Sequence, residues 1–577
     1  MGRWGVKGVF IDFEGIDGSG KTTLSNRLAQ RLKRLGYRVN HAREGGTLKA
    51  RASQRIRSLT RDPQLLELCP RAEFLLNLAR DAQQLDEVVK PALERGEVCI
   101  TDRYLPSQLA LSHAGRGLPL AELEPALRVA SQGIWPDLII LVDVEPELAR
   151  LRKRLGKIQE EREGDPPSRK GLAGSGLAAR AREAFLGMAR ADPGRWLVVV
   201  NDDQPLWVLE QRIVDAVLAR LEGREPTVEP IVPPGHALPP PEPTVEGLGE
   251  RFFRLLDSLE AREPGLAAFL LSGLNGLPAH QRRLAMAERF PRLVARGLRG
   301  LDDEGSFALR HLLKEQAPVE VAMGLPKNSP RSMALREELF ERAPKQVVEG
   351  LAGDSSEKAW ALRDRALAKG ALGPVLVSLA GDDSPRAWTL REVGFSSGLY
   401  DAVAESLVGL PGERAEAMRE QLVPLDRLAA LRALSEMDTP LATRLRQELV
   451  ERAAKPVMRS LAGMATEHAF ALREQVVERA PEALESLAGL DDERAWAMRE
   501  RYAERWPSAV LGSLGTAGLC ARGQALLARV LKACPDRLPV VRDAYALLLE
   551  AAEGPARSEQ RTPVGVTARP SAEVSAP

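Results

Sequence analysis

Eight residues near the amino terminus have the types and spacing of a phosphate-binding loop. They read Gly15-Ile16-Asp17-Gly18-Ser19-Gly20-Lys21-Thr22 and fit the pattern G-x-x-x-x-G-K-[ST]. Glycines let backbone N–H groups point inward around phosphate oxygens, while the lysine reaches the β- and γ-phosphates and the threonine hydroxyl binds Mg²⁺. The sequence therefore predicts ATP and Mg²⁺ as cofactors, held by Gly15, Ile16, Asp17, Gly18, Ser19, Gly20, Lys21, Thr22 and Thr23.

The segments on either side of this loop predict the elements that position it. Residues 9–13 are apolar and rich in strand formers, and leucines at 24, 28, 32 and 35 recur on one helical face that Gly36 would end. The positive end of that helix adds to the field around a bound phosphate. A chance glycine-rich turn is the alternative, which the flanking strand and helix disfavour.

Further strands and helices alternate up to about residue 221. Strand candidates are 98–101, 138–142 and 196–200, with a weaker one at 38–41, and helices such as 72–93 lie between them. Nearly continuous apolar strands joined by helices predict an α/β P-loop domain, with a parallel sheet covered on both faces. Ligands in such folds bind beyond the carboxyl ends of the strands. The polar residues to inspect there are Arg43, Asp102, Arg103 and Asp143.

Length and composition limit the classes of function. The 577 residues suggest two to four domains, and 81 Lys plus Arg against 80 Asp plus Glu give no electrostatic case for a nucleic acid or a membrane partner. The four cysteines show neither metal-ligand nor disulfide-framework spacing, which favours a reduced, cytoplasmic protein. The first residues lack the pattern of a signal peptide.

The second half of the chain predicts a separate architecture. Residues 223–247 are rich in proline and are expected to form a stiff linker after a first domain at 1–222. An arginine then recurs at intervals of 26 to 28 residues, and a proline often follows it by eight. The pattern predicts an all-α solenoid of short, HEAT-like two-helix repeats over 248–551, with degenerate capping units at about 250–280 and 515–551. Residues 552–577 are expected to be a disordered tail.

The recurring arginines have two interpretations. They could line a concave face and grip an acidic partner, or each could pair with an acidic residue of its own or the next repeat. The second is favoured, because glutamates lie beside most of them. The arginines are Arg283, Arg310, Arg336, Arg363, Arg391, Arg419, Arg446, Arg473 and Arg499.

A series of motifs in the first domain resembles the thymidylate kinase family of nucleoside monophosphate kinases. In order, the motifs are Phe13-Glu14-Gly15 to Thr23, Arg43-Glu44-Gly45-Gly46-Thr47, Thr101-Asp102-Arg103-Tyr104, Gly115-Arg116-Gly117 and Pro136-Asp137-Leu138. The resemblance covers about residues 8–221 and none of the solenoid. It implies transfer of a phosphoryl group from ATP to a nucleoside monophosphate, with dTMP as the default acceptor and dTDP as its product.

The resemblance and the chemistry together assign roles to the candidate residues. Lys21 serves the donor phosphates, and Thr22 and Asp102 are the candidate metal ligands. The resemblance implies that Arg43 and Arg103 bind the acceptor phosphate and that Asp17 lies near the acceptor sugar. In the family, a mobile lid follows the strand that corresponds to residues 138–144. Arg150 and Arg154 are candidates for the arginine that this lid brings onto ATP.

The base end departs from the family pattern. Asn77 takes the place of a phenylalanine that stacks on thymine, and Asp81 takes the place of an arginine that contacts it. Both are substrate-binding candidates, but we expect weak dTMP binding and a preference for a base with an exocyclic amine. Alternatively, the neighbouring Arg80 restores thymine recognition.

Two hypotheses for the whole chain remain open. The first is an active kinase with an attached solenoid that binds a protein partner. The alternative is a nucleotide-binding switch or inactive kinase whose helical repeats do the work. The resemblance is also compatible with a homodimer through the kinase domain.

Overall fold

The computed structural model describes residues 8–43, 49–160, 169–201, 204–224, 242–327, 329–515 and 519–553. The chain divides into two compact units, with the boundary near residue 237. Residues 225–241 of the predicted linker, 554–577 of the predicted tail and 44–47 of the Arg43 motif lie outside the described residues. Residues 245–247, predicted as linker, already belong to the first helix of the second unit. No helix in the described ranges is long and apolar enough to cross a membrane.

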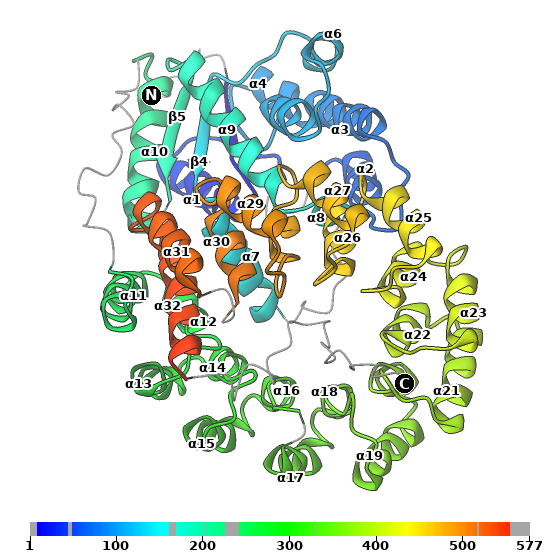
Figure 1. The fold of residues 1–577 in the computed structure, drawn as a ribbon. Helices are drawn as coiled ribbons and strands as arrows, with labels where there is room; N and C mark the ends of the chain where they lie inside the picture. Colours follow the sequence, from blue (N-terminus) through cyan, green and yellow to red (C-terminus); the bar gives the residue numbers. More distant parts are fainter. Residues whose placement is uncertain are drawn as a thin grey trace. The chain divides into compact units, whose positions relative to one another are not determined.

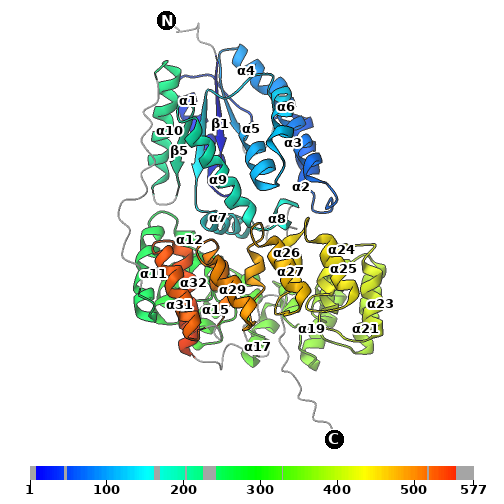
Figure 2. The same cartoon turned by 45° about the horizontal axis from the view of Figure 1, so that its top comes forward.

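The first unit contains a five-stranded parallel sheet in the order β2-β3-β1-β4-β5. Figures 1 and 2 show the sheet with helices packed around it. Its elements are β1 (Val9–Glu14), α1 (Lys21–Arg34), β2 (Val39–His41), α2 (Arg51–Arg61), α3 (Pro70–Gln84), a π-helical turn η2 (Leu85–Val89), α4 (Lys90–Glu94), β3 (Val98–Asp102), α5 (Leu105–Gln108), a second π-helical turn η3 (Leu109–Gly115), α6 (Leu120–Ser131), β4 (Leu138–Asp143), α7 (Pro146–Gln159), α8 (Arg169–Leu172), α9 (Gly176–Ala191), β5 (Trp196–Val200) and α10 (Leu206–Leu221). All five predicted strands are confirmed, and the predicted helix 72–93 is α3, η2 and α4 in succession.

Helices cover both faces of this sheet, as the apolar strands predict. Ile11 and Phe13 of β1 pack with α1 and α10 on one face. Phe10 points to the other face, where α3 and α6 cover it. Because the strands are parallel, their carboxyl ends lie at one edge, and the loops after β1, β2 and β3 meet there.

The second unit is a series of helical pairs. Its helices are α11 (Val245–Glu260), α12 (Pro264–Leu270), α13 (Leu277–Met286), α14 (Pro291–Gly297), α15 (Glu304–Leu313), α16 (Pro318–Met323), α17 (Pro330–Leu339), α18 (Pro344–Glu349), α19 (Glu357–Ala368), α20 (Leu372–Val377), α21 (Pro385–Ser396), α22 (Tyr400–Leu407), α23 (Glu413–Leu422), α24 (Arg427–Ala433), α25 (Pro440–Leu449), α26 (Ala454–Ser460), α27 (Glu467–Val476), α28 (Glu482–Glu485), α29 (Glu493–Tyr502), α30 (Pro507–Leu514), α31 (Ala521–Ala533) and α32 (Leu538–Glu553). Even-numbered helices pack in sequence along the inside, and odd-numbered ones lie outside, as Figure 1 shows for α13 to α18.

Local sequence signals position the ends of these helices. Asp492 is the N-cap of α29 and its side chain accepts a hydrogen bond from the Ala495 N–H, while Pro507 opens α30. The two helices of a repeat are too short to bury their apolar faces alone, so neighbouring repeats stack.

The recurring arginines are buried, and neither sequence interpretation describes their partners correctly. Arg446 donates from Nη2 to Leu434 O and Ser460 O, both at 3.0 Å, and from Nη1 to Met437 O at 2.8 Å. These carbonyls lie at or just beyond the carboxyl-terminal ends of the two successive inner helices α24 and α26, where helical C=O groups lack intrahelical partners. The arginines therefore join neighbouring repeats through backbone oxygens, and none of them pairs with a carboxylate among the described residues.

An aromatic ladder accompanies the buried arginines. The Trp388 ring lies between the guanidinium of Arg391, 4.9 Å from its centroid, and that of Arg414 from the next repeat, at 4.5 Å. The same arrangement surrounds Trp360 and Phe470. Cation–π contacts thus add to the contacts between repeats.

The solenoid closes into a ring, which corrects the prediction of capping units. The first helix, α11, packs against the last, α32, and the two lie side by side in both ribbon views (Figures 1 and 2). Phe252 stacks on Tyr545 with 5.7 Å between ring centroids, and Arg251 forms an ion pair with Asp536. Arg542 also donates to Leu270 O at 3.3 Å. The two terminal segments therefore pack against each other and do not cap open ends.

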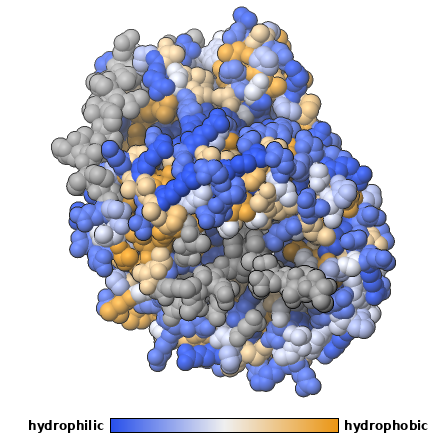
Figure 3. All heavy atoms as spheres, viewed as in Figure 1, coloured by the Kyte–Doolittle hydropathy of each residue, from blue (hydrophilic) through white to orange (hydrophobic). Residues whose placement is uncertain are grey.

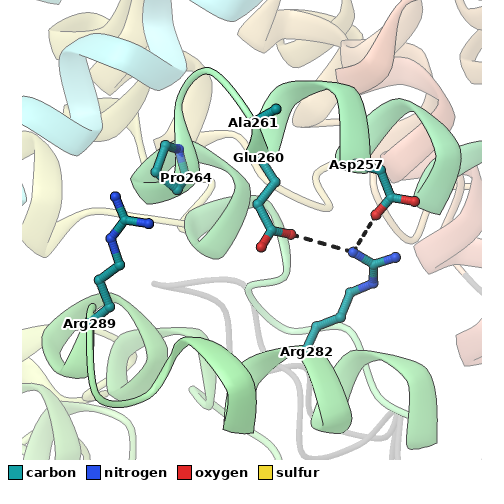
Figure 4. Close-up of a pocket in the computed structure, with 6 residues that line it drawn as sticks. All are labelled: Asp257, Glu260, Ala261, Pro264, Arg282 and Arg289. Carbon is teal, nitrogen blue, oxygen red and sulfur yellow. Dashed lines mark hydrogen bonds and ion pairs between the residues drawn. The ribbon is translucent and has the colours of Figure 1, made fainter.

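The surface of the ring carries paired charges. A hollow of about 440 Å³ beside α11 is lined by Asp257, Glu260 and Arg282 among others, and Arg282 pairs with both acids (Figure 4). Hydrophilic side chains predominate on the molecular face drawn in Figure 3, and hydrophobic ones are scattered. Because Arg282 neutralises both acids of the lining, we do not take the hollow as a functional site.

Candidate functional site

The glycine loop wraps the amino terminus of α1 as the sequence predicts. It connects β1 to α1, and Gly15 has a φ of 134°, with Val142 O only 2.3 Å from where a Cβ atom would lie. Gly20 has a φ of 96° and directly precedes Lys21, the first residue of the helix. No side chain fits at Gly15, so the loop backbone lies directly against β4.

Lys21 and Thr22 lie at the start of α1 and face the end of β3. The Lys21 ammonium donates to Ile16 O at 2.7 Å inside the loop. Burial, with a smaller contribution from the nearby Arg103 charge, lowers the pKa of Lys21 to about 7. The Thr22 hydroxyl donates to Asp102 Oδ2 at 2.6 Å. The donor end of the predicted site is therefore assembled, while Thr23 is exposed on the outer side of the helix.

The oxygens of Thr22 and Asp102 fit a magnesium ion. Asp102 Oδ1 is buried and has no hydrogen-bond partner among the described residues. Hydroxyl and carboxylate oxygens are ligands that Mg²⁺ prefers, and Mg²⁺ takes most of its other ligands from phosphates and water. Burial acts to raise the pKa of Asp102, but Lys21, Arg43 and the Thr22 hydrogen bond outweigh it, and the net pKa lies below the usual range.

Arg43 and Arg103 converge on the same edge of the sheet. Arg43 Nη1 lies 2.7 Å from Asp102 Oδ2, and Arg103 Nη2 lies 2.5 Å from Asp17 Oδ1 in the glycine loop. Arg103 has a φ of 79°, which is rare for a side chain of its size and indicates local backbone strain. The structure thus brings together Asp17, Lys21, Thr22, Arg43, Asp102 and Arg103.

Glu14 holds Arg103 in place through Ser107, a role that the sequence analysis did not predict. Its buried carboxylate accepts hydrogen bonds from the Ser107 N–H at 2.9 Å and the Ser107 hydroxyl at 2.6 Å. Ser107 Oγ also accepts from Arg103 Nη1 at 2.9 Å. Burial raises the pKa of Glu14, and the Arg103 charge opposes that shift. In the sequence, the position of Glu14 at the end of a predicted strand is the signal that could have marked it as a site residue.

Asp81, a candidate for contact with the nucleotide base, forms hydrogen bonds with neighbouring side chains of the protein. The Asp81 carboxylate is buried, accepts from Arg80 Nε and Nη2 at 2.8 and 2.6 Å through Oδ1, and accepts from Gln108 Nε2 at 2.7 Å through Oδ2. Arg80 Nη1 lies 3.4 Å from Asn77 Oδ1. Both carboxylate oxygens already accept hydrogen bonds, which argues against a role for Asp81 in selecting an amino-bearing base. Arg80 is thus anchored by Asp81 and lies beside Asn77.

The lid candidates remain predictions. Arg150 and Arg154 lie on α7 and are exposed, and residues 161–168 of the predicted lid are outside the described part of the chain. A neighbour that the sequence reasoning omitted, Lys153, places its ammonium 4.0 Å from Asp17 Oδ2. At the end of β4, Asp143 forms a two-point pair with Arg182, at 2.7 and 2.8 Å.

Two further arginines, Arg57 and Arg61 of α2, were also missed. Arg57 is within electrostatic reach of Arg43 and Arg80, and Arg61 of Asp17 and Arg103. Their spacing of four residues on one helix was the available signal, because such residues share a helical face.

Comparisons with known proteins find similarity to thymidylate kinases in the first part of the chain. The model of the family "Thymidylate kinase" matches residues 13–173. A thymidylate kinase of Bifidobacterium longum subsp. infantis is 40% identical over 229 residues, which are 37% of this chain and 94% of that protein. A thymidylate kinase of Deinococcus radiodurans is 39% identical over 215 residues, covering 37% of this chain and 98% of that protein. A solved thymidylate kinase from Ehrlichia chaffeensis matches with 23% identity and a TM-score of 0.28, over 37% of this chain and 99% of that one.

Proposed function

The chain belongs to the thymidylate kinase family, and on this basis we propose that it transfers the γ-phosphoryl group of ATP to dTMP, giving ADP and dTDP. Family membership supports a phosphotransferase that acts on a nucleoside monophosphate. The observation that carries the proposal is the assembly of donor-end and acceptor-end groups at one edge of the sheet. These groups are Lys21, Thr22, Asp102, Arg43 and Arg103.

Phosphoryl transfer requires positive charge on both anions and precise alignment, and the proposed roles follow from position. Lys21 and the loop N–H groups hold the donor phosphates, and Thr22 and Asp102 hold Mg²⁺. Bound Mg²⁺ supplies charge neutralisation on the phosphates. Arg43 and Arg103 hold the acceptor phosphate, for which the planar guanidinium offers two parallel donors.

The base end supports dTMP through Arg80. A thymine carbonyl needs a donor, and Arg80 has one edge anchored on Asp81 while Nη1 is directed toward Asn77. A hydrogen bond from a charged group to a neutral acceptor contributes about 1.5–3 kcal/mol, equivalent to about tenfold to 150-fold in affinity. We therefore expect Arg80 to favour a base that presents a carbonyl there.

The test is ADP release with ATP and a panel of deoxynucleoside monophosphates. We expect turnover of dTMP, its loss in Lys21→Ala, and a rise in the KM for dTMP of about tenfold or more in Arg80→Ala. Arg128→Ala, which changes an exposed arginine on α6, is the matched control and should resemble wild type. Unchanged dTMP kinetics in Arg80→Ala would contradict the assignment of the base end.

The same assay separates the kinase from the alternative function. Binding of ATP without turnover of any monophosphate would favour a nucleotide-binding switch whose helical repeats act on a protein partner. We also propose that the ring of the second unit binds a protein, since long helical-repeat surfaces serve this purpose. Affinity capture with the full chain, compared with capture by the first unit alone, tests that proposal.

A further inference from the structure

Helix α2 directs two arginines toward the acceptor end of the site. Arg57 and Arg61 are one helical turn apart, so both project from the same face, while Arg55 projects from another. Arg57 is half-buried. The positive charges that act on it most strongly are, in decreasing order of electrostatic effect, those of Arg61, Arg43 and Arg80. The most strongly interacting charge near Arg61 is Asp17. Ser53, one turn before Arg57 on the same face of α2, donates to Arg80 O at 3.0 Å, so this face of α2 packs against α3 beside Arg80. Arg43 and Arg80 are within electrostatic reach of both arginines.

The remaining arginines of this site each have a carboxylate partner. Arg43 pairs with Asp102, Arg80 with Asp81 and Arg103 with Asp17, at 2.5 to 2.7 Å. Among the described residues, neither Arg57 nor Arg61 has a carboxylate within ion-pair distance. In the described part of the chain, the acceptor end therefore has five arginines, of which Arg61 is exposed, against the three carboxylates Asp17, Asp81 and Asp102, so positive charge is in excess there.

This arrangement is costly until an anion arrives. Burial and the adjacent Arg61, Arg43 and Arg80 charges lower the pKa of Arg57 to about 9. A bound anion relieves like-charge repulsion of this kind, and a guanidinium is suited to carboxylate or phosphate oxygens. In the proposed function, Arg43 and Arg103 bind the acceptor phosphate that receives the phosphoryl group. Arg57 and Arg61 are therefore available to bind a different anionic group.

We propose that Arg57 and Arg61 form a second anion-binding position in the acceptor site, which takes a nucleotide carrying an anionic group besides its 5′-phosphate. The proposal rests on the proposed function and narrows its substrate class. The additional group is a phosphate on the sugar or a carboxylate on the base, and the two share the chemistry that the arginines recognise. The proximity of Arg61 to Asp17, which the family resemblance places near the sugar, favours the sugar phosphate.

Calorimetry with the full chain, in the presence of a non-hydrolysable ATP analogue, tests this without requiring turnover. The probes are dTMP, thymidine 3′,5′-bisphosphate and 5-carboxy-dUMP. We expect at least one doubly anionic probe to bind about tenfold or more tightly than dTMP, since charge-assisted hydrogen bonds are the strong class. Preference for the bisphosphate locates the second group on the sugar, and preference for the carboxylate locates it on the base.

Substitutions identify the residues responsible. In Arg57→Ala and Arg61→Ala, affinity for the preferred probe should fall at least tenfold more than affinity for dTMP, while Arg55→Ala, on another face of α2, should match wild type. Equal losses for all three probes would overturn the proposal, because the arginines would then serve the common 5′-phosphate. Tighter binding of dTMP than of both other probes would also overturn it. Failure of the proposed function is a separate result, namely absence of ADP release with every acceptor.

Discussion

Replacing one buried arginine of the ring should destabilise it far more than replacing its exposed neighbour. Arg446 on α25 is fully buried, and its guanidinium reaches three backbone carbonyls and the Ser460 hydroxyl at 2.8 to 3.0 Å. Burial lowers the pKa of Arg446 to about 10, which still leaves it protonated at neutral pH. The substitution Arg446→Leu removes every donor and leaves the carbonyls inside the protein.

The magnitude follows from the number of abandoned acceptors. Of the three carbonyls, Leu434 O also accepts from the Met437 N–H and Ser460 O from the Glu436 N–H, so only Met437 O is left without a partner among the described residues. An unsatisfied buried acceptor costs about 1–3 kcal/mol and each of the other two lost hydrogen bonds about 0.5–1.5 kcal/mol, which gives about 2–6 kcal/mol before relaxation. Leucine regains some apolar packing, and water can reach a relaxed site. We therefore expect a net loss in the free energy of unfolding of about 2–4 kcal/mol.

The assay is urea unfolding of the full chain followed by circular dichroism at 222 nm. The chain has two compact units, so two transitions are expected, and the one that ATP shifts belongs to the first unit. Arg446→Leu should lower the midpoint of the other transition. Arg444→Leu on the same helix, where Arg444 is exposed, should stay within about 0.5 kcal/mol of wild type.

A third variant separates the effect of the several N–H donors of the guanidinium from the effect of its positive charge. Arg446→Lys keeps a positive charge but cannot reach three carbonyls at once, so it should lose nearly as much stability as Arg446→Leu. Wild-type stability in Arg446→Lys would show that charge alone is required. A loss in Arg446→Leu no larger than that in Arg444→Leu would refute the reasoning about abandoned carbonyls.

Three further predictions concern the first unit and its connection to the second. Lys21→Ala should weaken ATP binding and abolish transfer, and equal ATP affinity by calorimetry would contradict this. Asp12→Asn should raise the unfolding midpoint of the first unit at neutral pH, because burial and the Glu14 charge raise the pKa of Asp12, whose Oδ2 has no hydrogen-bond partner among the described residues. The cost of the Asp12 charge is absent below the ordinary aspartate pKa and grows as pH rises toward the raised value, so the gain should vanish in acid. Limited proteolysis should cut first near Gly235 and release an amino-terminal fragment that still binds ATP, whereas protection of that stretch would argue against separate folding.

The features that the sequence revealed are those with local causes. Strands β1, β3, β4 and β5 are short apolar runs between turn signals, and the glycine loop has a spacing that few other structures require. Residues that follow strands could be selected as site candidates because parallel strands end at a common edge. This argument identified Arg43, Asp102 and Arg103 without any knowledge of their contacts.

The features that it could not reveal depend on partners without a sequence signature. Every residue has a backbone carbonyl, so the amino-acid sequence around Arg446 does not indicate that Leu434 O is its hydrogen-bond acceptor. The pairing of Asp81 with Arg80 and Gln108 depends on side-chain rotamers, which no sequence pattern records. Ring closure joins Phe252 to Tyr545 across nearly the whole second unit, beyond the reach of any local pattern.

Closure of the ring restricts how such a chain can change during evolution. Open repeat arrays lengthen or shorten by duplication or loss of a unit, because each repeat contacts only its neighbours. In a closed ring the rotations between successive repeats must sum to a full turn, so adding or deleting one repeat would pull α11 away from α32. The number of repeats is thus fixed by geometry, and variation is confined to substitutions and to the loops, where the spacing of the arginines already varies between 26 and 28 residues.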